Sequence, residues 1–272
     1  MVRIWLCILL SLILSACSPA KQNFNGEIRV GTMAGSDTEL LQVVQNVALE
    51  RYGLRVDIIQ YTDYSQPNEA LMKGNIDINA YQHQPYLIAW NASHNGNLIA
   101  VAKTYIYSMG IYSYKVNRVK ELTKNNVIVI PNDLTNQARA LLLMQKAGLI
   151  TLRPGADVLA APRDIMANPL NLKIETADAA QLPNMLPNAD AAVINSNYAI
   201  LAGLIPQRGE MSPTRKDAIY IEDKDGLYAN VLVIRPDEKN DPKVWELIDA
   251  FHSPQVMAAA RTIFHGGAIK AW

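Results

Sequence analysis

The sequence predicts an α/β fold made of two lobes. Short apolar runs typical of buried strands alternate with segments whose apolar residues recur at helical spacing, which is the pattern of α/β proteins. This alternation occurs twice, within 27–81 and again within 126–264, and predicts one lobe for each series. The 272 residues suffice for two domains of ordinary size, and half of them are hydrophobic, so the chain can bury a large core.

The first series begins with a strand and a long helix. Strands are expected at 27–32, 55–61 and 76–81. The helix over 35–53 contains Ser36 and Glu39 at the spacing of a capping box, in which each side chain bonds the backbone of the other. Gly53 can adopt the left-handed conformation that ends a helix, so we expect the helix to stop there.

A short helix and a turn complete the first series. The helix is expected over 67–74, with Pro67 at its first position. The third strand ends inside "NAYQHQPYL" (79–87), where Pro85 predicts a turn.

The second series has more elements. Strands are expected at 126–130, 171–176, 190–195 and 230–237. Helices are expected from the turn at Pro131 to Gly148, over 242–252 and over 254–264. Sheets of this kind bind ligands beyond the carboxyl ends of their strands. Polar residues that follow the strands are therefore the candidates for a site.

The first residues predict export and a lipid anchor. Residues 1–16 have a cationic Arg3, an apolar run too short to span a bilayer, and then small residues, as in a signal peptide. "LSAC" (14–17) resembles the bacterial lipobox, in which the cysteine becomes acylated after cleavage. Cys17 is therefore the expected lipidation site, and 17–26 the expected lipidated tether. The alternative is an ordinary signal-peptidase site at Ala16.

Composition excludes several classes of function. The remaining cysteine, Cys7, lies inside the predicted signal peptide, so the folded part has no disulfide, thiolate metal site or cysteine nucleophile. Basic and acidic residues number 25 each, which gives no basic surface for nucleic acid. The four histidines lack zinc-site spacing, and no dinucleotide or phosphate-loop fingerprint occurs. We expect no metal, no cofactor and no catalytic residue, with His83 as the one candidate base if the protein were an enzyme.

Polar and aromatic residues gather at the ends of the predicted strands. They are Tyr61, Tyr64, Tyr81, His83, Arg139, Asn195 and Asn230. Taken singly, each has an ordinary structural role, such as packing, a solvated charge or a turn. Together they supply a guanidinium for a carboxylate, amides for polar groups and rings for an apolar side chain. That is the chemistry of a pocket for a free amino acid.

Six blocks of sequence resemble the NlpA lipoprotein family, the methionine-binding lipoproteins of methionine ABC importers. The resemblance runs from about residue 27 to Trp272, and its blocks are "NAYQHQPYL", "VIPNDLTNQARALLLMQKAGLI", "NPLNLKIETADAAQLPNML", "AVINSNYA", "YIEDKDGLYANVLV" and "FHGGAIKAW". It implies a two-lobed type II periplasmic-binding-protein fold with the ligand cleft between the lobes. Lobe 1 would comprise 27–110 and 229–272, and lobe 2 would comprise 111–228.

The resemblance also implies a function and roles for the candidate residues. The protein would be a monomeric, membrane-anchored receptor on the extracytoplasmic side, delivering methionine to an importer's permease and ATPase subunits. Tyr81 and His83 would lie near the ligand side chain, and Asn230 would bind its polar end. Asn195 would be the pocket asparagine of the family's "VIN" segment. Arg139, the arginine of the family's N-x-x-R segment, would clamp the ligand carboxylate through two hydrogen bonds, and its loss would weaken binding without unfolding the protein.

Some positions depart from the family pattern. Gln84 stands where the family usually has lysine or arginine, and Gly226 stands where serine is common. Two alternatives stay open on the sequence alone: a receptor of the same fold for another amino acid or a short dipeptide, and a surface lipoprotein with no transport role.

Overall fold

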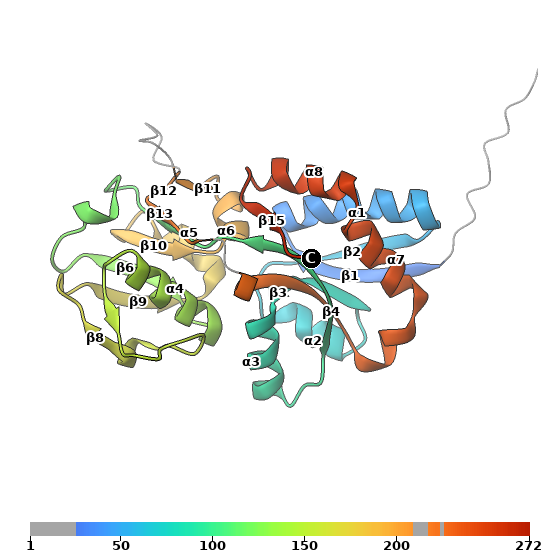
Figure 1. Ribbon diagram of the computed structural model, residues 1–272, viewed down its shortest axis with the longest axis horizontal. Helices are drawn as coiled ribbons and strands as arrows, with labels where there is room; N and C mark the ends of the chain where they lie inside the picture. Colours follow the sequence, from blue (N-terminus) through green and yellow to red (C-terminus); the bar gives the residue numbers. More distant parts are fainter. Residues whose placement is uncertain (1–25, 209–216, 224–225) are drawn as a thin grey trace, which may run out of the picture.

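The computed structural model describes residues 26–208, 217–223 and 226–272. The expected signal peptide, Cys17 and all but the last residue of the expected tether lie outside the described residues. Figure 1 shows two groups of strands and helices side by side, each built around its own sheet. Within the described ranges, no helix is long and apolar enough to cross a membrane.

The first sheet has six strands in the order β15-β4-β14-β3-β1-β2. Their bounds are β1 Glu27–Met33, β2 Arg55–Tyr61, β3 Ile78–His83, β4 Ile99–Tyr107, β14 Ala229–Ile234 and β15 Ala268–Lys270. Strand β1 pairs in parallel with β2 and β3, whereas β14 runs antiparallel between β3 and β4. A strand from the end of the chain therefore completes the sheet begun by the first series.

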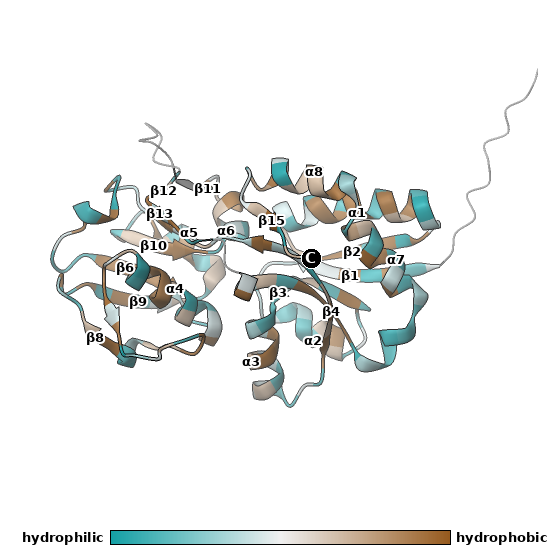
Figure 2. Ribbon diagram, viewed as in Figure 1, coloured by the Kyte–Doolittle hydropathy of each residue, from teal (hydrophilic) through white to brown (hydrophobic). Residues whose placement is uncertain are grey.

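Helices cover both faces of the first sheet. Helices α1 (Ser36–Tyr52), α7 (Pro242–Phe251) and α8 (Pro254–Ile263) lie on one face, and α2 (Gln66–Met72) and α3 (Gln84–His94) lie on the other (Figure 1). Strand β14 (ANVLVI), inside the sheet, carries an almost continuous apolar run because a sheet covered on both sides buries both of its faces. Figure 2 shows the corresponding brown interior with teal outer helix surfaces.

The second sheet has five strands in the order β13-β5-β10-β6-β9. Their bounds are β5 Gly110–Tyr112, β6 Val127–Pro131, β9 Lys173–Ala177, β10 Ala191–Ile194 and β13 Tyr220–Ile221. Helix α4 (Leu134–Lys146) packs on one face, while α5 (Leu182–Met185) and α6 (Ser196–Leu201) pack on the other. Two small two-stranded sheets join β7 (Thr151–Leu152) to β8 (Ile165–Ala167) and β11 (Ile205–Arg208) to β12 (Asp217–Ala218).

The chain passes between the two sheets twice. The first crossing leads from β4 to β5 through residues 108–109, and the second leads from β13 to β14 through the 3₁₀ helix at Gly226–Tyr228. Glu222 joins the two crossings, because it donates its backbone N–H to the carbonyl of Met109 and accepts the Met109 N–H through its side chain at 3.0 Å. We propose lobe boundaries on this basis, with 27–110 and 229–272 in lobe 1 and 111–228 in lobe 2.

The start of α1 differs from the sequence expectation. Gly35, not Ser36, caps the helix, with φ of 91°, a value that favours glycine. Ser36 is the first helical residue, and its buried Oγ makes no hydrogen bond, so the expected capping box with Glu39 is wrong. The C-terminal end of α1 is as expected, because Gly53 has φ of 65° and its N–H donates to the last carbonyls of the helix.

The stretch at 79–87 is not a strand followed by a turn. Strand β3 continues to His83, and α3 begins at the next residue. Pro85 lies in the first turn of this helix, where its missing N–H costs nothing and its fixed φ suits the start. His83 caps the helix through Nδ1, which accepts the N–H of Tyr86 at 3.1 Å. Strand β4, at Ile99–Tyr107, was not expected from the sequence.

Candidate functional site

A cavity lies between the two lobes. Its lining comes from both: Asp37, Tyr64, Tyr81, Gln82, His83, Tyr86, Tyr107, Asn136, Arg139, Asn195, Ser196, Asn197 and Asn230. Six of the seven residues singled out from the sequence are in this set. The seventh, Tyr61, does not line the cavity, and its ring edge lies 3.1 Å from the position a Cβ would take at Gly31.

Three tyrosines form an aromatic wall. The ring centroids of Tyr64, Tyr81 and Tyr86 lie 6.0 to 6.1 Å apart, and the hydroxyls of Tyr81 and Tyr86 both donate to the carbonyl of Tyr64 at 3.1 and 3.0 Å. Burial raises the pKa of all three phenols, so they stay neutral at physiological pH. The wall therefore presents uncharged ring surface to an apolar group.

His83 is buried and neutral. Since its Nδ1 accepts the Tyr86 N–H, its proton is assigned to Nε2, which donates to Oδ1 of Asn136 at 3.3 Å. Burial, helped by the positive charge of Arg139, lowers the pKa of His83 to about 3. A residue with this pKa is a weak base, so its chemistry favours packing and hydrogen bonding over proton abstraction.

The lobes are in contact around the cavity. Asn136 Oδ1 accepts from His83 of lobe 1 and from Nδ2 of Asn195 of lobe 2, the latter at 2.9 Å. The hydroxyl of Tyr64 donates to Oδ1 of Asn197 at 2.7 Å, again from lobe 1 to lobe 2. An apolar cluster containing Met33 and Tyr81 as well as residues of α5 and α6 also spans the boundary. The arrangement is thus a closed cleft.

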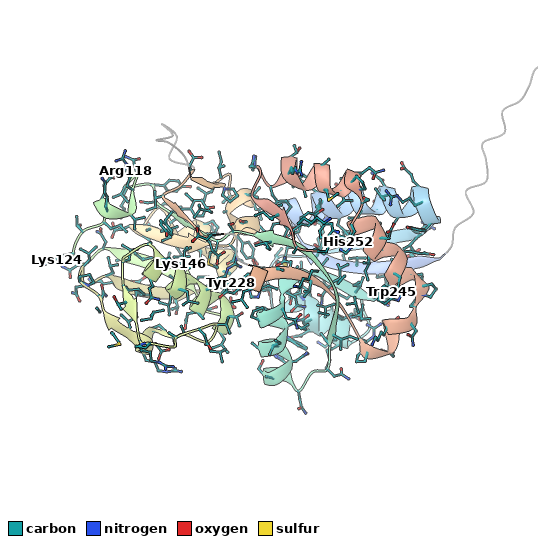
Figure 3. All side chains as sticks on the ribbon, in the orientation of Figure 1. Arg118, Lys124, Lys146, Tyr228, Trp245 and His252 are labelled. Atoms are coloured by element: carbon teal, nitrogen blue, oxygen red, sulfur yellow. The ribbon has the colours of Figure 1, made fainter. Side chains whose placement is uncertain are left out.

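Arg139 is held by the chain crossings. It is 3% exposed, and its Nε donates to Oε1 of Glu222 at 2.9 Å. Its Nη2 also bonds Glu222 and donates to the Tyr107 carbonyl at 2.8 Å, while the guanidinium carbon lies 4.2 Å from the centre of the Tyr228 ring. Figure 3 shows Tyr228 between the lobes. Arg139 thereby ties α4 of lobe 2 to both crossings.

The expected two-bond clamp by Arg139 stays a prediction, and in this geometry Nη1 would have to take part in it. A bidentate contact needs two outward-facing N–H groups, and Glu222 and Tyr107 already use Nε and Nη2. Nη1 alone makes no hydrogen bond to any described residue, and it is the atom left to meet a ligand. In contrast to the sequence expectation, we predict that removing Arg139 destabilises the fold, because Glu222 is buried beside it.

Several cavity residues were not singled out from the sequence. They are Asp37, Gln82, Tyr86, Tyr107, Asn136, Ser196 and Asn197. The sequence could have indicated Asn136, because it is the first residue of the N-x-x-R segment that ends at Arg139. Tyr86 and Asn197 also lie within blocks that carried the family resemblance. For Asp37 the sequence offered only an acidic residue in the first turn of a helix, which is an ordinary place for one.

Two buried amide atoms of the cavity could meet a polar ligand. Asn195 Oδ1 and Asn197 Nδ2 are buried and make no hydrogen bond to the described residues. More than nine in ten buried polar groups in native proteins are satisfied, so such atoms call for an explanation. One is an acceptor and the other a donor. No cluster of three or more potential metal ligands occurs among the described residues.

Comparison with known proteins identifies the family. A family model described as NlpA lipoprotein matches residues 28–272. The chain belongs to this family. Among curated NlpA relatives, the D-methionine-binding lipoprotein MetQ of Salmonella typhi is 42% identical over 264 residues, covering 96% of this chain and 94% of that protein. The protein of the same name from Escherichia coli K12 is 41% identical over the same length.

Solved structures of NlpA-like proteins share the fold. A periplasmic substrate-binding protein of an ABC transporter from Coxiella burnetii is 46% identical with a TM-score of 0.84, covering 90% of this chain and all of that one. A nutrient-binding protein from Burkholderia cenocepacia bound to methionine is 42% identical with a TM-score of 0.84 and the same coverage. The family and the two-lobed α/β fold expected from the sequence are confirmed.

Proposed function

We propose that this NlpA family member is the substrate-binding protein of an ABC importer, and that it binds methionine in the interlobe cavity and delivers it to the permease and its ATPase subunits. The observation that carries the proposal is the division of the cavity into an aromatic wall and a polar part with unpaired buried donors and acceptors. An apolar side chain on a zwitterionic head group requires this combination.

The aromatic part fits a thioether. A sulfur atom near aromatic edges gains about 0.3–1.5 kcal/mol per contact. Tyr64, Tyr81 and neutral His83 offer such edges, and against these neutral rings the charged end of a glutamate or lysine side chain would be costly to bury. Tyr61 is left out of the proposed site because it does not line the cavity.

The polar part fits the head group of an amino acid. Nη1 of Arg139 and Nδ2 of Asn197 are donors for the carboxylate, and Oδ1 of Asn195 is an acceptor for the ammonium. Asn230 holds the wall in place by donating from Nδ2 to the Tyr81 carbonyl at 3.2 Å. We also propose that the protein is a monomer and acts by binding, without enzymatic chemistry.

A thermal-shift panel of the twenty amino acids tests the ligand. Methionine should raise the melting temperature the most, by about 5–10 °C at a hundred times its Kd, because binding the native state adds about 2.7 kcal/mol at that concentration. Leucine should give a smaller shift, and glutamate and lysine none. A shift with another amino acid, a dipeptide or a sugar, and none with methionine, would refute methionine as the ligand.

We also propose that acylated Cys17 anchors the protein on the extracytoplasmic face of the membrane. Family membership and the "LSAC" stretch support this proposal. In cells, Cys17→Ala should abolish acylation and move the folded protein from the membrane fraction to the soluble fraction. Ser18→Ala, which leaves the cysteine in place, is the control. Unchanged membrane association of the Cys17→Ala protein would contradict the proposal.

A further inference from the structure

One buried carboxylate in the cavity has no partner. Asp37, the second residue of α1, is 9% exposed and lines the cavity, yet it makes no side-chain hydrogen bond or ion pair with any described residue. The two other buried carboxylates of the described residues are both compensated. Glu222 pairs with Arg139, and Asp164 accepts from Arg153 and from the Ala161 N–H at 2.7 and 2.9 Å.

The ordinary explanation for an acidic residue at this position is incomplete. A carboxylate in the first turn of a helix gains from the helix dipole by about 0.3–1 kcal/mol, and that gain is available to an exposed side chain. Glu39, in the same turn, is exposed and fits this explanation. Burying a charge costs several kcal/mol, which the dipole does not offset. Asp37 therefore needs another reason to face the cavity.

No cation on the surrounding elements is available to Asp37. The titratable groups that feel its charge are the phenols of Tyr64, Tyr107 and Tyr198, which come from the loop after β2, from β4 and from α6, and all three stay neutral. His83 is neutral as well, and the guanidinium of Arg139 is already paired with Glu222. With Asp37 ionised, the cavity carries one uncompensated negative charge.

The position of Asp37 is fixed by the contact between the lobes. Gly35 precedes the helix in a left-handed conformation, and a Cβ there would come within 3.2 Å of Cδ1 of Leu201 on α6. The turn that carries Asp37 is thus packed against lobe 2. A cationic group bound in the closed cleft would meet a carboxylate that is already in place and already shielded from water.

We propose that Asp37 binds the α-ammonium group of the amino-acid ligand and makes the site select ligands that carry this group. This inference rests on the proposed function, since it assumes that an amino acid occupies the cavity. The amide oxygen of Asn195, which has no hydrogen-bond partner, supplies a neutral acceptor for the same group. Arg139 Nη1 and Asn197 Nδ2 remain for the ligand carboxylate, so the two ends of the zwitterion meet different residues.

Calorimetry with methionine and 4-(methylthio)butanoate, which is methionine without its ammonium group, tests the assignment. The wild-type protein should bind methionine at least thirty-fold more tightly than 4-(methylthio)butanoate. This ratio of dissociation constants corresponds to the loss of a buried charge pair. Asp37→Asn should weaken methionine binding by a similar factor and leave the affinity for 4-(methylthio)butanoate unchanged or higher. Glu39→Gln, in the same helical turn, is the control and should behave like the wild type.

The outcomes separate this inference from the proposed function. If Asp37→Asn binds methionine as the wild type does, or weakens both ligands equally, the ammonium role of Asp37 is refuted while methionine binding stands. If the wild-type protein binds neither methionine nor any other amino acid, the proposed function fails and this inference fails with it.

The pH dependence of the wild-type protein gives a second readout that needs no variant. Burial raises the pKa of Asp37 to about 7, so below pH 7 the Asp37 carboxyl group of the empty site is mostly protonated. This proton must leave before the carboxylate can pair with the ligand ammonium group. Methionine affinity should fall about fifty-fold from pH 7 to pH 5, while both charged groups of the ligand stay ionised. An affinity for methionine that stays constant over this range would also overturn the inference.

Discussion

Arg139→Met is expected to weaken methionine binding at least thirty-fold and to lower the free energy of unfolding by about 3–5 kcal/mol. Both effects follow from the position of the guanidinium between the cavity and the chain crossings. Its removal takes away the Nη1 donor and leaves the carboxylate of Glu222 buried, with 8% of that side chain exposed, without its positive partner. Urea unfolding and calorimetry measure the two quantities separately.

A second substitution separates stability from binding. In Arg139→Met/Glu222→Leu, neither charge of this pair is left buried without its partner, so the double variant should recover much of the lost stability without recovering methionine affinity. Arg51→Met is the control, because its ion pair with Asp249 is partly exposed and should contribute less than about 1 kcal/mol. If Arg139→Met were as stable as the wild type, the pair with Glu222 would not be a structural link between α4 and the chain crossings.

Asn136→Leu is expected to lower the free energy of unfolding by about 3 kcal/mol and to impair ligand binding. The Asn136 amide accepts from Asn195 and His83, and donates to both carboxylate oxygens of Asp133 at 3.1 Å. Leucine has nearly the same size but makes none of these bonds, and each buried polar group left without a partner costs about 1–3 kcal/mol. The bond to His83 is also a link from one lobe to the other.

Gln137→Leu is the matched control for the Asn136 substitution. It changes an amide to leucine one residue further along α4, where the Gln137 side chain makes no hydrogen bond and is only partly buried. Its unfolding in urea and its methionine-induced thermal shift should match those of the wild type. Equal behaviour of the two leucine variants would show that the amide network does not hold the cavity together.

The sequence located several strands and part of the cavity lining, but not β4, β5, β13 or β15. Apolar runs located strands β1, β2, β6, β9, β10 and β14 to within a few residues, because a sheet buried on both faces needs them. Six of the seven chosen residues line one cavity, since residues that follow strands collect at one edge of each sheet. Helix α3 was missed because Pro85 signals a turn and a helix start equally well.

The sequence could not predict which charged residues pair with one another or which are buried. Glu222 lies 83 residues from Arg139, and only the second chain crossing brings the two together. "IEDKDG" showed an acidic residue but not its burial. In the same way, "GSDTEL" placed Asp37 in the first turn of a helix, and the packing of the lobes decided that it faces the cavity. Burial and pairing are properties of the tertiary structure, and they change the chemistry of these groups.

The most direct test of the central claim is mass spectrometry of the small molecules held by the purified protein. The protein is incubated with a mixture of amino acids, sugars and short peptides, freed of unbound molecules, and then denatured. Methionine should be released at a ratio of one molecule per chain, and the Arg139→Met/Glu222→Leu protein should release little. Release of a sugar or a peptide in that amount, or of no amino acid at all, would contradict the account.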